Sequence, residues 1–218
     1  MLILAVDTSG KTCSCAVADS ARGLLLGTHM VYTARAHSQI LMPMTKQLLA
    51  ETGHTVQDVD IFACADGPGS YTGLRIGVAA MQALAFAGDR QCIGISTLEG
   101  LAWNLCAFRG VICAALAARQ NLCYCAFFES DGQQITRLTD DAVRPADEIA
   151  AQIAGYETPV MLCGDGTALI APLCEGALPA PMHLMHQSAA GIALAAMHSE
   201  PVPPEKLAVR YLQAVKIG

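Results

Sequence analysis

The sequence has few charged residues, and this shortage excludes one class of protein. Only 15% of its 218 residues are charged, and the formal net charge is −6. A surface with this balance is unsuited to holding nucleic acid by neutralising phosphates. Any contact with RNA is therefore expected to need a more basic partner.

Long apolar runs and zinc-type cysteine pairs are also missing. No apolar run reaches the roughly 20 residues that cross a membrane, and only a short run at 2–6 precedes Asp7, so neither a membrane span nor a secretory signal is expected. None of the ten cysteines forms a Cys-x-x-Cys pair. We interpret them as reduced, buried core residues rather than metal ligands. We expect a cytoplasmic protein without bound metal.

Apolar residues make up 53% of the chain, enough for one large domain or two small lobes that share a core. Their spacing predicts an element order that occurs twice. The first half contains strands at 2–6, 13–18 and 24–32, a helix at 38–51, a strand at 59–65 and a helix after Gly73. After a strand at 91–96 and a helix at 98–107, strands at 111–117, 122–129 and 134–139 precede a helix at 147–154, a strand at 160–163 and a helix at 167–173. Beyond Ser188 we expect a helix to about His198, and a segment at 209–212 that returns to the first half.

The stretch from Asp66 to Gly77 is the best clue to function in the chain. It joins a buried-strand pattern to a helix through a turn with two glycines and a proline. The free N–H groups at such a helix start suit either an anion or a closely packed backbone. Because the stretch lacks the Gly-Lys-Ser/Thr ending of a phosphate loop, a close-packed turn without a ligand stays open beside a phosphate site.

The string from Gly67 to Arg75, Gly-Pro-Gly-Ser-Tyr-Thr-Gly-Leu-Arg, closely resembles the signature of the bacterial TsaB family, also called YeaZ. Further similarity runs through most of the chain, at Asp7-Thr8-Ser9, His37-Ser38, Pro43, Ala118-Arg119 and Tyr124. The end of the chain departs from the family, because Val209-Arg210-Tyr211-Leu212-Gln213 stands where a Pro-x-Tyr-Leu-Arg string is common.

The resemblance and the repeated element order together imply the fold. We expect an α/β protein with the two-lobed architecture of actin, Hsp70 and the sugar kinases, a ribonuclease H-like fold in which a βββαβα unit is duplicated. The expected N-terminal lobe covers residues 1–108 and carries the partner-binding helices. A smaller C-terminal lobe covers residues 109–218, with its last segment returning to the first lobe.

A nucleotide site is one interpretation of the turn after the first strand. In actin-like proteins this turn binds phosphate, and Asp7, Thr8 and Ser9 occupy it here, with Asp7 suited to position a hydrated metal. The alternative is that the three side chains only order a hairpin. In the second half the family usually carries an acidic residue where this chain has Ala117, which disfavours phosphoryl transfer. We therefore expect no required cofactor, with weak ATP or ADP binding at Asp7, Thr8 and Ser9 left open.

The family resemblance also argues against catalysis. The catalytic sister of TsaB holds its metal through a His-x-x-x-His pair, and the corresponding positions here are Thr97 and Leu101. Neither side chain replaces an imidazole as a metal ligand. We expect no catalytic residues and no metal ligands.

The helix at 38–51 carries more apolar surface than one buried stripe needs. The helix after it adds a seam of small residues, Gly73, Gly77, Ala80 and Ala87, that permits backbones to approach closely. Either a larger core encloses them, or they bind another protein. The family implies the second, a helical bundle with the catalytic sister. The predicted interface comprises Ile40, Leu41, Met44, Leu48, Gly73, Leu74, Arg75, Gly77, Val78 and Met81. An interface at these positions predicts that Leu48→Asp or Gly77→Leu disrupts association and leaves the monomer folded.

The resemblance implies a noncatalytic subunit of the complex that forms N6-threonylcarbamoyladenosine at position 37 of tRNA. Its implied partners are the catalytic subunit TsaD and, through the assembled pair, the ATPase TsaE, with a homodimer forming when TsaD is absent. Contact with tRNA would be indirect, and no membrane is involved. An ATP-dependent small-molecule kinase and a glycoprotein metallopeptidase remain alternatives.

Overall fold

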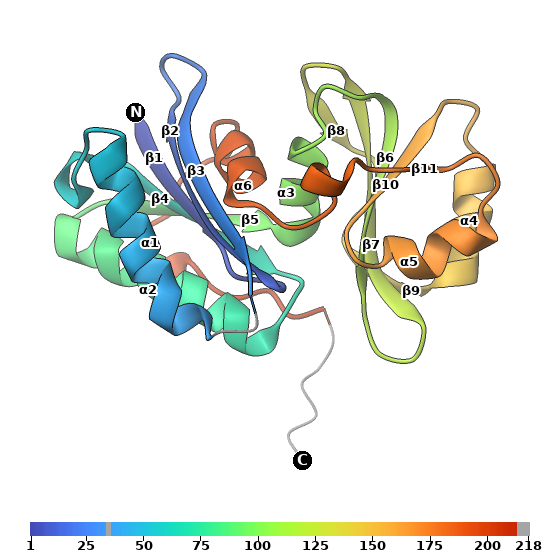
Figure 1. Ribbon diagram of the computed structural model, residues 1–218, viewed down its shortest axis with the longest axis horizontal. Helices are drawn as coiled ribbons and strands as arrows, with labels where there is room; N and C mark the ends of the chain where they lie inside the picture. The colour runs from blue at the N-terminus through green and yellow to red at the C-terminus, as the bar shows by residue number, and fades with distance from the viewer. Residues whose placement is uncertain (34–35, 213–218) are drawn as a thin grey trace. The chain divides into compact units, whose positions relative to one another are not determined.

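The structure, a computed structural model, describes residues 1–33 and 36–212 (Figure 1). Its contacts divide the chain into two compact units. Of the described residues, unit 1 comprises those within 1–100 and 187–210, and unit 2 comprises residues 101–186 with Tyr211 and Leu212. The expected boundary after residue 108 therefore lies inside unit 2. One contact that ties this segment to unit 2 is the 2.7 Å hydrogen bond that the Ser130 hydroxyl donates to the Cys106 carbonyl.

Unit 1 is built on a five-stranded sheet in the order β3-β2-β1-β4-β5. Its strands are β1 (Leu2–Asp7), β2 (Thr12–Asp19), β3 (Leu24–Tyr32), β4 (Ile61–Gly67) and β5 (Gln91–Ser96). β1 runs antiparallel to β2 and parallel to β4, so it lies at the centre of a mixed sheet. β1 and most of β2 are buried along their length because helices cover both faces of the sheet (Figure 1).

The helices of unit 1 are α1 (His37–Glu51), α2 (Tyr71–Gly88), α3 (Thr97–Trp103), in which the division between the units falls, and α6 (Ala189–Ala196). α1 and α2 cover one face of the sheet and α6 the other (Figure 1). The core beneath α1 and α2 collects alternate residues of β1, namely Leu2, Leu4 and Val6. α2 begins after Ser70, whose hydroxyl accepts a 3.2 Å hydrogen bond from the Gly73 N–H and so caps the helix.

Unit 2 repeats the arrangement with the order β11-β10-β6-β7-β8, while β9 pairs with β7. Its strands are β6 (Arg109–Ala117), β7 (Leu122–Asp131), β8 (Ile135–Arg137), β9 (Ala142–Pro145), β10 (Val160–Cys163) and β11 (Leu178–Pro179), and its helices are α4 (Ala146–Ala154) and α5 (Thr167–Ile170). Here β6 takes the central place, antiparallel to β7 and parallel to β10. Short 3-10 helices at Val56–Asp58, Ala171–Leu173, Met182–Leu184 and Pro204–Lys206 complete the chain.

The duplicated βββαβα order expected from the sequence is confirmed, and so is the α/β class. Most predicted elements differ from the observed ones by one to three residues. The helix expected at 98–107 is shorter, because the chain passes into turns after Trp103. The helix expected at 167–173 is four residues of α-helix followed by a 3-10 turn.

Among residues 1–33 and 36–212, none of the helices combines the length and the apolar character needed to cross a bilayer.

Candidate functional site

The turn after β1 is packed into unit 1 rather than left open. Asp7, Thr8 and Ser9 are each no more than 2% exposed. The Asp7 carboxylate accepts hydrogen bonds from the Ser9 N–H at 2.8 Å and from the Ser9 hydroxyl at 2.6 Å. The Thr8 hydroxyl donates to the Gly73 carbonyl in the first turn of α2, at 2.7 Å. The three side chains that we interpreted as a phosphate turn thus all bond to their own chain.

The glycines between Gly67 and Gly77 make room for neighbouring segments of the same unit. A Cβ atom at Gly67 would meet the Arg210 carbonyl, one at Gly69 the Ser9 carbonyl, and one at Gly73 the Thr8 carbonyl, each at a separation under 3.0 Å that side chains do not adopt. At Gly77 the obstacle would be the Thr8 hydroxyl, at 2.7 Å. The signature is therefore a junction at which the turn after β1, the start of α2 and the C-terminal segment meet.

Asp7 lies in this junction as a buried acid. Burial raises its pKa from 3.8 to about 6, and the two hydrogen bonds from Ser9 oppose part of that rise. Because the folded state then holds the Asp7 proton more tightly than the unfolded state does, ionisation of this group costs stability as the pH rises.

We expect Asp7→Asn to remove a pH-dependent loss of stability. In the wild type this group should lower the free energy of unfolding as the pH rises from about 4 to about 7, by on the order of 3 kcal/mol. Asparagine keeps the oxygen that accepts from Ser9 but does not titrate. Urea unfolding of both proteins at several pH values measures the difference, and parallel curves for the two proteins would contradict a raised pKa at Asp7.

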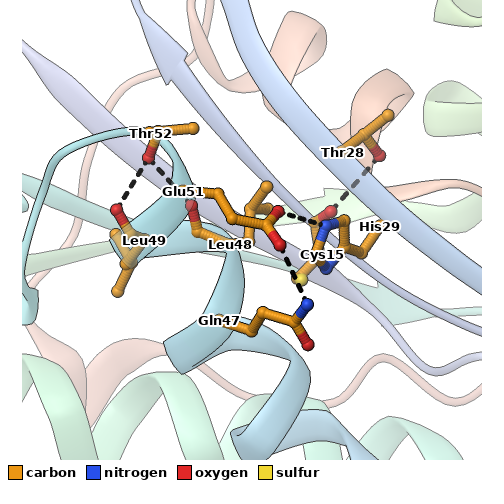
Figure 2. A network of polar contacts seen from close by, with 8 residues as sticks. All are labelled: Cys15, Thr28, His29, Gln47, Leu48, Leu49, Glu51 and Thr52. Carbon is orange, nitrogen blue, oxygen red and sulfur yellow. Dashed lines mark hydrogen bonds and ion pairs between the residues drawn. The ribbon is translucent and has the colours of Figure 1, made fainter.

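α1 is fixed to the sheet by a polar network near its C-terminal end (Figure 2). The His29 ring on β3 lies 2.8 Å from the Glu51 carboxylate, which also accepts a 2.9 Å hydrogen bond from Gln47. The Thr52 hydroxyl bonds back to the carbonyls of Leu48 and Leu49, each at 3.0 Å. Gln47 and Glu51 are exposed, so this network lies on the solvent side of α1, whereas Leu48 and Leu49 face the core.

Most of the predicted interface residues face the core of unit 1. The buried ones are Leu41, Leu48, Gly73, Leu74, Gly77, Val78 and Met81. Ile40 and Met44 are half-buried, and Arg75 is exposed. Thr8 of the same chain lies against Gly73 and Gly77, so these two glycines pack on the turn after β1.

A different row of α2 is exposed, which we call the outer row. It consists of residues at a spacing of four along the helix, Tyr71, Arg75, Ala79, Ala83 and Ala87. The Arg75 guanidinium lies 4.0 Å from the centre of the Tyr71 ring, and Phe86, beside the row, is 59% exposed. An exposed helix face normally carries several charges, whereas Arg75 is the only charged residue in α2. Of the residues predicted for the interface, Arg75 belongs to this row, whereas most of the others are periodic apolar residues that face the core.

A hollow of about 380 Å³ lies beside α2, on the side of α1. Met42, Leu49, Val56 and Leu84 give it mainly apolar walls, and His54 lies among its lining residues. Met42 is 41% exposed. Lys46 is the one lysine or arginine among the residues that line the hollow.

The positions compared with the catalytic sister's histidines are enclosed. Thr97 and Leu101 are at most 1% exposed. In the ranges 1–33 and 36–212, no group of three histidine, cysteine, aspartate or glutamate side chains is placed to hold a metal ion. In unit 2 the backbone N–H of Ala117 donates a 2.9 Å hydrogen bond to the Asp165 carboxylate.

Comparisons with known proteins place these features in a family. A family model described as TsaD, tRNA N6-adenosine threonylcarbamoyltransferase, matches residues 27–216. The tRNA threonylcarbamoyladenosine biosynthesis protein TsaB of Escherichia coli is 30% identical, over 93% of this chain and 94% of that protein. The chain belongs to the TsaB family. The TsaB protein of Bacillus subtilis is also 30% identical, over 82% of this chain and 77% of its own length.

Solved structures agree with membership of the TsaB family. YeaZ from Pseudomonas aeruginosa superposes with a TM-score of 0.84 at 27% identity, over 97% of this chain and 99% of that one. The ethanolamine utilisation protein EutJ of Carboxydothermus hydrogenoformans is 12% identical, with a TM-score of 0.53 over 89% of this chain and 90% of that one. A ROK hexokinase of Thermus thermophilus is 11% identical, with a TM-score of 0.50 over 90% of this chain and 98% of that one. These two likenesses concern the fold alone.

Proposed function

We propose that this chain is a noncatalytic subunit of the complex that forms N6-threonylcarbamoyladenosine at position 37 of tRNA. It docks onto the catalytic subunit TsaD and stabilises the active arrangement of that subunit. The family membership supports the pathway, because the curated relatives are named as tRNA threonylcarbamoyladenosine biosynthesis proteins. The exposed outer row of α2 is the observation that supports docking.

The outer row is suited to a partner helix. Alanines at 79, 83 and 87 allow another helix to approach closely, and Phe86 beside them is a large apolar anchor. The apolar hollow beside α1 accepts a side chain from the same partner. We therefore propose an interface on the outward face of α2, whereas most of the positions suggested by the sequence are buried in unit 1.

The rest of the proposed role concerns tRNA, the further partners and the cofactor. With a formal net charge of −6, the chain reaches tRNA only through more basic subunits. TsaE joins the assembled pair, and a homodimer through the same row forms when TsaD is absent. The complex works in the cytoplasm, and the chain requires no cofactor of its own.

The double variant Ala79→Arg with Ala83→Arg is expected to weaken binding to TsaD by on the order of a hundredfold, because two bulky charges enter a close helix contact. The matched control is Ala151→Arg, an exposed alanine on α4 in unit 2. Calorimetric titration of purified TsaD measures the affinity, and thermal unfolding confirms that each variant is folded. Undiminished binding by a folded double variant would contradict docking through the outer row.

A further inference from the structure

A strap of ten residues, Pro201–Arg210, closes unit 1 after α6. Val202 exchanges two 2.8 Å backbone hydrogen bonds with Cys92 on β5. Leu207 is 5% exposed and belongs to the core beneath α1 and α2. The Gln82 amide in the second half of α2 donates to the carbonyls of Pro204 and Leu207, at 2.8 and 2.9 Å. One amide side chain of α2 thus holds two points of the strap.

The strap ends on the signature turn before α2. The Arg210 N–H donates to the Asp66 carbonyl at 2.7 Å, and the Arg210 guanidinium lies 2.6 Å from the Asp66 carboxylate. The Asp66 side chain is 8% exposed and that of Arg210 is 54% exposed. Gly67 has a φ of +135°, and its missing side chain leaves the space that the Arg210 carbonyl fills. The first glycine of the signature is thereby explained by the strap rather than by a ligand.

We propose that the strap is a clamp that holds α2 in the orientation its outer row needs for docking, and that Arg210 and Gln82 are its positioning residues. The clamp contacts α2 at Gln82 and contacts the chain at Asp66, four residues before the cap Ser70. These two contacts add to the packing of the buried face of α2, because they restrain its second half and the segment that leads into its first turn. Because the outer row is on this helix, the inference depends on the proposed docking function.

The clamp acts through pre-organisation. A partner binds only those molecules in which the docking surface is in place. The apparent affinity therefore falls as the fraction of molecules with a misplaced surface rises. A hydrogen bond between charged groups, one of them buried, holds that fraction low. Loosening the strap should therefore lower docking affinity although none of its residues belongs to the outer row.

Arg210→Met in the full-length chain is the direct test. We expect binding to TsaD to weaken by about three- to tenfold, with faster amide hydrogen exchange at Val202, at Arg210's neighbours and in the turn 67–70 of the free chain. Arg210→Lys keeps the charge and should recover most of the affinity. Arg22→Met, on an exposed turn between β2 and β3, removes the same charge and should change neither reading.

Gln82→Met provides a second, independent variant. It removes both amide contacts to the strap while keeping the length of the side chain. Like Arg210→Met, it should weaken binding to TsaD and speed amide hydrogen exchange in the strap. If exchange rises in these variants but docking is unchanged, the strap is only a structural tie and the inference is overturned. If neither reading changes, the clamp does not exist.

The exchange measurement separates this inference from the proposed function. Failure of the wild-type chain to bind TsaD would refute docking itself, and the docking role of the strap with it. The hydrogen-exchange rates of the free variants would still show whether Arg210 and Gln82 hold the strap and the signature turn in place. Normal binding by the wild type with unaffected binding by both variants would refute the clamp alone.

Discussion

Replacing Leu48 by aspartate should unfold unit 1 rather than release a partner from a folded monomer. Leu48 is 2% exposed and belongs to the core between α1 and the sheet. The substitution removes a large apolar side chain and puts an unpaired carboxylate in its place, at a cost of roughly 4 kcal/mol or more. The free energy of unfolding of a domain is roughly 5–15 kcal/mol, so this loss is a large share of it.

Urea denaturation followed by circular dichroism measures the loss. Met42→Asp is the matched control, because it changes the charge equally on the same helix at a residue that is 41% exposed. We expect the control to lose no more than about 1 kcal/mol. A Leu48→Asp protein with wild-type stability that had lost its partner would restore the interface first predicted from the sequence.

Gly73→Ala should lower the free energy of unfolding by a similarly large amount, although the same substitution inside a helix is normally stabilising. Alanine at an ordinary helix position is favoured over glycine by about 1 kcal/mol. At Gly73 the new Cβ would collide with the Thr8 carbonyl, and the Thr8 hydroxyl already bonds to the Gly73 carbonyl. The start of α2 must then move away from the turn after β1, so we expect a loss of about 3 kcal/mol.

Gly88→Ala, at the end of the same helix, is the comparison. Its Cβ would meet only the flexible Arg90 side chain, at 3.3 Å, so the substitution should be neutral or slightly stabilising. Thermal unfolding of the two variants and the wild type measures whether alanine destabilises the protein at Gly73 and not at Gly88. Equal melting temperatures for Gly73→Ala and Gly88→Ala would show that the junction is loosely packed and that the signature glycine has another role.

The fold could be predicted from the sequence because the apolar runs of strand length recur in the same order in both halves. The short strands were harder to predict. β9 and β11, of four and two residues, exist because β7 and β10 offer them an edge, and they carry no pattern of their own. The contacts divide the units after residue 100 rather than after residue 108, and the hydrogen bond from Ser130 to the Cys106 carbonyl is a tertiary contact that no local pattern records.

The candidate site was only partly predictable, for a physical reason. A periodic apolar residue on a helix indicates burial, but it does not tell a core from an interface, and Leu41, Leu74 and Met81 proved to be core residues. Small residues at helical spacing likewise permit a close approach without saying what approaches. Gly73 and Gly77 admit Thr8 of the same chain, whereas the alanines of the outer row face solvent.

The role of the strap lay beyond sequence reasoning as well. The departure of 209–213 from the family string was visible, but the pairing of Arg210 with Asp66 joins residues that are 144 positions apart. Gln213, at the end of that string, lies outside the described residues.

The central claim is that this chain activates a catalytic partner without itself catalysing the reaction. Formation of threonylcarbamoyladenosine on tRNA, followed by mass spectrometry of the digested nucleosides, tests it most directly. The reaction is run on unmodified tRNA with threonylcarbamoyl adenylate as the donor, with TsaD and TsaE in the presence and absence of this chain, and with this chain alone. We predict modification only when TsaD and this chain are both present; modification by this chain alone, or equal modification by the partners without it, would contradict the claim.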